Sequence, residues 1–101
     1  MATTSKALFR GAATTTVGTT LYTVPSATTT IVSNIAVTNT AASAGTFTLA
    51  LAGTAIHTTT AIAANTTIYI DCKQVLVATN TITGGASATS INFHISGVEV
   101  A

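Results

Sequence analysis

The chain has 101 residues and a formal net charge of +1, and only 5% of its residues are charged, compared with about 25% in ordinary soluble domains. This length fits a single domain and leaves no room for a second core. Intrinsic disorder is disfavoured, because disordered chains combine low hydrophobicity with high net charge, whereas 48% of this chain is hydrophobic.

The uncharged residues are mostly small or β-branched. The sequence contains 25 Thr and 19 Ala, and aromatic residues make up only 5% of it. Threonine suits pleated strands because it branches at Cβ, so we expect a thin aliphatic core beneath a threonine-rich surface. Such a surface has few charges to keep copies apart and should tolerate close neighbours.

The N-terminal segment, residues 1–18, is predicted to be an extended arm with one short strand. It has little to pack apart from Leu8 and Phe9, and it carries the only local cluster of positive charge, Lys6 and Arg10. Two cations are enough for one or two ion pairs with another protein. We therefore expect these four residues to bind a partner protein.

Residues 19–101 show apolar and polar residues alternating with period two, and no long window has a 3.6-residue period. Turn residues such as Pro25, Gly53 and Asn80 separate the alternating runs. About seven or eight short strands at this spacing predict an all-β domain, a single antiparallel β-sandwich of Ig-like or jelly-roll-like type. The clearest predicted strands are residues 21–24, 31–37, 46–51, 67–71, 74–77, 81–83 and 90–96.

Alternation is clearest in the last of these, residues 90–96, where Ile91, Phe93 and Ile95 fall on one face. These positions predict a half-buried strand. After Gly97 the apolar positions shift by one residue, and a glycine inside a strand often marks a bulge. We therefore expect the strand to bend or to change neighbours near Gly97.

Residues able to support catalysis or metal binding are few and form no recognisable motif. Asp71 and Glu99 are the only carboxylates, and the spacing of His57 and His94 matches no short metal-binding pattern. A single cysteine, Cys72, supports neither an intramolecular disulfide nor a paired-cysteine zinc site. We expect no catalytic residues, no metal and no cofactor, and hence a protein that is not an enzyme.

Nucleic acid and membranes are not expected partners. The Lys6 and Arg10 cluster is too small for affinity based on phosphate contacts, and no apolar stretch approaches the roughly 20 residues of a membrane span. The first sixteen residues lack the apolar run of a secretion signal. These features predict a soluble protein made without such a signal.

Several segments resemble the strands of small β-sandwich virion proteins of tailed bacteriophages. The resemblance covers residues 19 to about 100 and consists of strand and loop signatures without chemistry. It is carried by residues 21–25 (LYTVP), 30–32 (TIV), 37–40 (VTNT) and 95–99 (ISGVE).

The resemblance implies a structural subunit, repeated many times on a particle, that decorates or cements the capsid. It implies the major capsid protein or another virion protein as partner, self-association commonly as a trimer, synthesis in the host cytoplasm and a final position on the capsid exterior. A tail, neck or fibre component is the alternative within the same setting. Another alternative is a module that binds a host glycan, for which Tyr22 and Tyr69 are the only candidate aromatic platforms.

Overall fold

The computed structural model describes residues 3–71 and 73–101, and these residues form nine β-strands. No described segment forms a helix that is long and apolar enough to cross a membrane. The strands are β1 (Thr3–Ala12), β2 (Thr20–Thr23), β3 (Thr29–Asn39), β4 (Gly45–Leu51), β5 (Thr54–Ile62), β6 (Thr66–Ile70), β7 (Gln74–Leu76), β8 (Thr81–Ala86) and β9 (Ile91–Val100).

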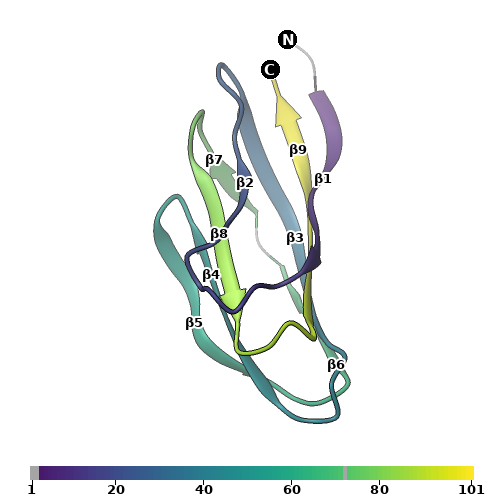
Figure 1. Ribbon diagram of the computed structural model, residues 1–101. Helices are drawn as coiled ribbons and strands as arrows, with labels where there is room; N and C mark the ends of the chain where they lie inside the picture. Colours follow the sequence, from purple (N-terminus) through teal and green to yellow (C-terminus); the bar gives the residue numbers. More distant parts are fainter. Residues whose placement is uncertain (1–2, 72) are drawn as a thin grey trace.

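The strands make two antiparallel sheets that pack face to face (Figure 1), which confirms the predicted β-sandwich. Sheet A has the order β1-β9-β3-β6, with β7 also pairing with β3, and sheet B has the order β2-β8-β4-β5. The molecule is elongated, about 46 × 21 × 18 Å. The ends of β1 and β9 that carry the termini lie together at one end of the sandwich (Figure 1).

The strand pairs are nested, so that each pair encloses the previous one along the chain. The hairpin β4–β5 is enclosed by the pair β3–β6, then by β2–β8, and finally by β1–β9. Successive pairs alternate between the two sheets. This arrangement is the jelly roll, one of the two sandwich types expected from the sequence.

The core lies between the sheets and is built from the alternating positions of the strands. In β9, Ile91, Phe93 and Ile95 are buried while His94 is exposed, as predicted. Phe93 meets Phe47 of sheet B edge to face, with ring centroids 6.3 Å apart, a preferred aromatic geometry. Most other core side chains are aliphatic.

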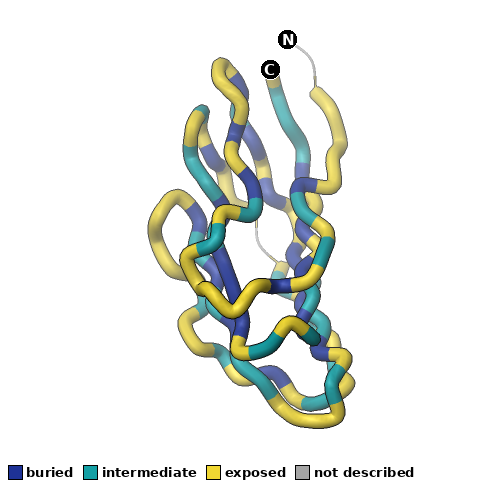
Figure 2. Tube along the Cα trace, in the orientation of Figure 1, coloured by how far each residue is buried: buried dark blue, intermediate teal, exposed yellow. Residues whose placement is uncertain are grey.

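The predicted N-terminal arm is instead mostly a strand of the sandwich. Thr3–Ala12 forms β1, which pairs with β9 of the same chain along its length. Leu8 is the unpaired residue of a bulge between Ala7 and Phe9 and lies in the core, where it is only 7% exposed. Most other β1 residues are exposed (Figure 2), because β1 is an edge strand, and for that reason its sequence lacks clear alternation.

The expected irregularity at Gly97 lies in the neighbouring strands. β9 keeps β1 and β3 as neighbours on both sides of Gly97, while β1 and β3 each contain a bulge beside it. A Cβ at Gly97 would collide with the carbonyl oxygen of Ile31 and lie 2.9 Å from Leu8 Cδ1. Glycine is therefore required where the three strands approach this closely.

Candidate functional site

Beyond these bulges, towards the termini, sheet A reverses the usual arrangement of polar and apolar residues. On β3, Thr30 is fully buried whereas Ile31 is 36% exposed. On β9, Glu99 pairs with Thr30 and shares its inward side, and Val98 pairs with Ile31 and shares its outward side. Thr30 and Glu99 thus lie on the inward side beside the buried Val32 and Leu76, whereas Ile31 and Val98 face outward.

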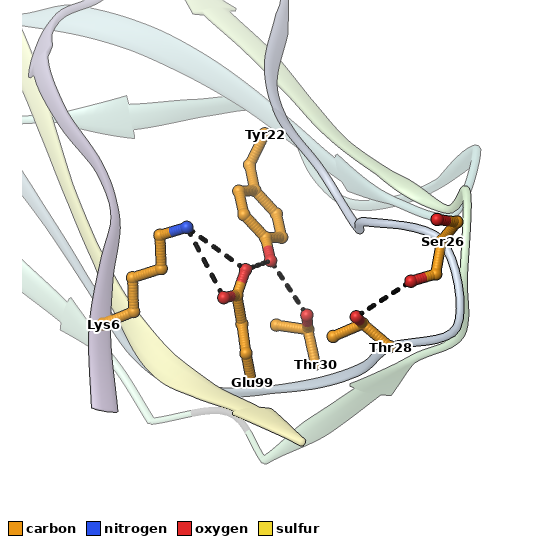
Figure 3. A network of polar contacts seen from close by, with 6 residues as sticks. All are labelled: Lys6, Tyr22, Ser26, Thr28, Thr30 and Glu99. Carbon is orange, nitrogen blue, oxygen red and sulfur yellow. Dashed lines mark hydrogen bonds and ion pairs between the residues drawn. The ribbon is translucent and has the colours of Figure 1, made fainter. Parts of the chain in front are cut away.

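The inward polar groups form a connected cluster at this end of the sandwich (Figure 3). Tyr22 of sheet B extends to sheet A and donates its hydroxyl proton to Glu99 Oε2. Because a tyrosine hydroxyl has one proton, Thr30 must be the donor in the 2.9 Å contact between Thr30 Oγ1 and Tyr22 Oη. Lys6 Nζ lies 3.3 Å from Glu99 Oε2, so the cluster joins β1, β2, β3 and β9.

This environment shifts the titration of two groups in opposite directions. The hydrogen bond from Tyr22 is the main cause that lowers the pKa of Glu99 below its ordinary value of 4.5, and Lys6 adds to the effect against the opposing influence of burial. The pKa of Tyr22 is raised above 10.0, mainly because burial disfavours the phenolate and also because of the bond to Glu99. The cluster is therefore held as carboxylate and neutral phenol.

We expect stability to decline on both sides of a plateau. A lowered Glu99 pKa means that the unfolded chain binds more protons below about pH 4.5, so the free energy of unfolding falls as the pH drops through the folded pKa. A raised Tyr22 pKa means that the unfolded chain loses its phenol proton first above about pH 10.0, so stability also falls there. Urea unfolding titrations at pH values from 3 to 11 measure the free energy of unfolding on both sides of the plateau, the acid limb and the alkaline limb.

Glu99→Gln should flatten the acid limb and leave a smaller alkaline limb, because burial still raises the pKa of Tyr22. Asp71→Asn is the matched control, because Asp71 is the only other acidic side chain and is highly exposed. An unchanged acid limb in Glu99→Gln would show that the cluster does not control acid stability.

On the outward side, apolar residues line up across three strands of sheet A. Ile31 pairs with Val98 on one side and with Val75 of β7 on the other, and Val75 is 62% exposed. Tyr69 of β6 pairs with Ala36 on the same face and is 72% exposed. We call this surface, defined by Ile31, Val75, Val98 and Tyr69, the outer face of sheet A.

The same side of sheet A contains an open hollow of about 430 Å³. It lies at the two bulges, where the strands bend around Gly97. Most of the residues around it are small, and Ser33 Oγ donates a 3.1 Å hydrogen bond to the carbonyl oxygen of Ser96. The lining residues are Ser5, Lys6, Ala7, Arg10, Ser33, Ser96, Gly97 and Val98.

The four residues expected to bind a partner occupy different environments. Leu8 is buried, and Phe9 is partly buried against the core, so both stabilise their own chain. Lys6 forms an ion pair with Glu99. Arg10 is exposed and lies opposite His94 on the outward side of sheet A, which leaves it as the residue best placed to meet a partner.

The remaining polar candidates do not come together. His57 lies in sheet B, with its ring 5.2 Å from that of Phe47 and its Nδ1 3.1 Å from Thr60 Oγ1, while His94 lies in sheet A. No group of three or more metal-binding side chains occurs in residues 3–71 and 73–101. Cys72 lies outside the described residues.

Comparison of the chain with protein-family models and with curated proteins finds no match. Its function is therefore inferred from its own residues.

Proposed function

We propose that the protein is a non-enzymatic structural subunit that attaches through the outer face of sheet A to a larger protein assembly, most simply as a decoration or cement subunit on a phage capsid. The observation that supports this most is the outward position of Ile31, Val75 and Val98, while Thr30 and Glu99 lie on the inward side behind them. Departures from normal patterning tend to occur at functional sites, and exposed apolar residues gathered on one face are typical of interfaces.

The fold and the composition support the same setting. Jelly rolls occur in viral capsid proteins and in lectins, although a fold alone does not define a function. A chain with 5% charged residues gains little solubility from its charge. Such a surface suits a protein that functions in contact with neighbouring subunits.

The proposed partner is the major capsid protein or another virion protein, with the subunit on the capsid exterior. Self-association, with a trimer favoured, would present several outer faces to the lattice at once. Linked contacts of modest strength then give stable attachment. A subunit that binds only the assembled state also stabilises that state by mass action.

A tail, neck or fibre component, or a module that binds a host-surface glycan, is a second candidate. Tyr22 is buried and bonded to Glu99, which removes one of the two aromatic platforms considered from the sequence. Tyr69 is 72% exposed and stays available to stack on a sugar ring. A glycan-binding role would therefore depend on Tyr69.

Cosedimentation with assembled particles tests the proposal. We expect the purified protein to bind saturably to capsids that lack it and not to isolated tails, because a repeated lattice offers a fixed number of equivalent sites. Binding to tails or host cells without binding to capsids would favour the second candidate. No binding to any of them would contradict both.

A further inference from the structure

We propose that the hollow in sheet A receives a carboxylate side chain of the partner protein and that Arg10 is its main ligand. The inference rests on the proposed function for the existence of a partner. It adds the chemistry of the contact and its place on the fold.

The distribution of charge singles out Arg10. The chain has three Lys and Arg residues and two Asp and Glu residues. Lys6 pairs with Glu99, and Lys73 pairs with Asp71 at 3.2 Å. Among the described residues no ion pair involves Arg10, so the net charge of +1 corresponds to one uncompensated guanidinium.

The sheet directs this guanidinium to the hollow. Arg10 follows the β1 bulge and pairs with His94, whose side chain is on the outward face of β9. Ser5 and Ser96 line the same hollow and present hydroxyl donors. Since small residues form most of the lining, a side chain from another protein has room to enter beside Arg10.

The chemistry favours a carboxylate as the guest. A guanidinium offers parallel N–H donors that match the two oxygens of a carboxylate, and such charge-assisted pairs are stronger than neutral hydrogen bonds. Lys6 also lines the hollow, but Glu99 compensates its charge, so the one uncompensated cation matches a single negative charge. The apolar row of Val98, Ile31 and Val75 continues from the hollow across sheet A, so the ion pair would sit at the border of an apolar contact, where it specifies orientation.

Three variants test the role of Arg10 in particle binding. Arg10→Gln should weaken binding to capsids by roughly tenfold or more, and Arg10→Lys should recover only part of the loss because it keeps the charge without the paired donors. Thr23→Glu is the control, since it also lowers the net charge by one, at an exposed position on sheet B. Equal binding by wild type and Arg10→Gln would overturn the inference and leave the proposed function intact.

A second measurement needs no particle. Amide chemical shifts are recorded by NMR during titration with acetyl-glutamate amide, acetyl-glutamine amide and inorganic phosphate. We expect saturable shifts at Ser5, Arg10 and Ser96 with the glutamate probe only, and their loss in Arg10→Gln. Equal shifts with the glutamine probe, a stronger response to phosphate, or no saturable shift at the hollow would each overturn the carboxylate assignment, whatever the capsid experiment shows.

Discussion

A chain that begins at Val17 is expected to lose the cooperative fold of the full-length protein. The deletion removes Leu8 and Ala13 from the core and exposes the β9 edge that β1 covers. Losing a buried leucine side chain alone costs about 2–5 kcal/mol, a large part of the roughly 5–15 kcal/mol that stabilises a typical domain. Thermal unfolding followed by circular dichroism should show a broad transition or none.

Two full-length variants, Leu8→Ala and Arg10→Gln, are the comparisons for this experiment. Leu8→Ala keeps the strand but loses a core side chain, so it should still unfold cooperatively, with a midpoint below that of wild type. Arg10→Gln changes an exposed side chain and should unfold like wild type. A deleted chain with the wild-type midpoint would show that residues 1–16 are a dispensable arm, as their sequence suggests.

The fold could be predicted wherever one side of a strand faces the core and the other faces solvent. Period-two alternation located β9 and β4 well, and the hairpin between β4 and β5 follows from Gly53, whose φ is +81°. The sandwich followed from the number of such segments. The choice of the jelly roll over an Ig-like order depended on which distant strands pair, and local sequence carries little information about that.

Edge strands were the main source of error. β1 buries only one of its side chains, so from its sequence a ten-residue strand looks like an extended arm with one short strand. Leu8 and Phe9 are adjacent in sequence yet both contact the core, because Leu8 is the extra residue of a bulge. Bulges change which face a residue occupies, and alternation alone cannot reveal them.

One feature of the sequence, the shift of apolar positions after Gly97, indicated the candidate site. That shift correctly marks the point where Val98 turns outward and Glu99 turns inward. The cluster itself could not be predicted, because Tyr22, Thr30 and Glu99 meet only after two sheets have packed. Arg10 was identified as a partner-binding candidate from its charge, but its hollow depends on bulges in β1 and β3.

Loss of particle binding when a charge is placed on the outer face of sheet A is the second large effect that we expect. Val75→Glu puts a carboxylate into the apolar row beside Ile31, and burying an unpaired charge at an interface is costly. Because Val75 is 62% exposed, the free protein should fold normally. Its affinity for capsids should fall by well over tenfold.

Thr23→Glu is the matched control. Thr23 lies on the short edge strand β2 of sheet B, is exposed, and follows the inward-facing Tyr22. The Thr23→Glu variant therefore adds the same negative charge as Val75→Glu, but on the outward side of sheet B. The free energy of unfolding of both variants should stay close to that of wild type.

The most direct test of the account is the capsid affinity of these two variants, measured by cosedimentation beside the wild-type protein. The account predicts that Val75→Glu no longer binds at concentrations where wild type and Thr23→Glu saturate the particle. Equal binding by all three proteins, or a loss confined to Thr23→Glu, would contradict the claim that the outer face of sheet A is the attachment surface.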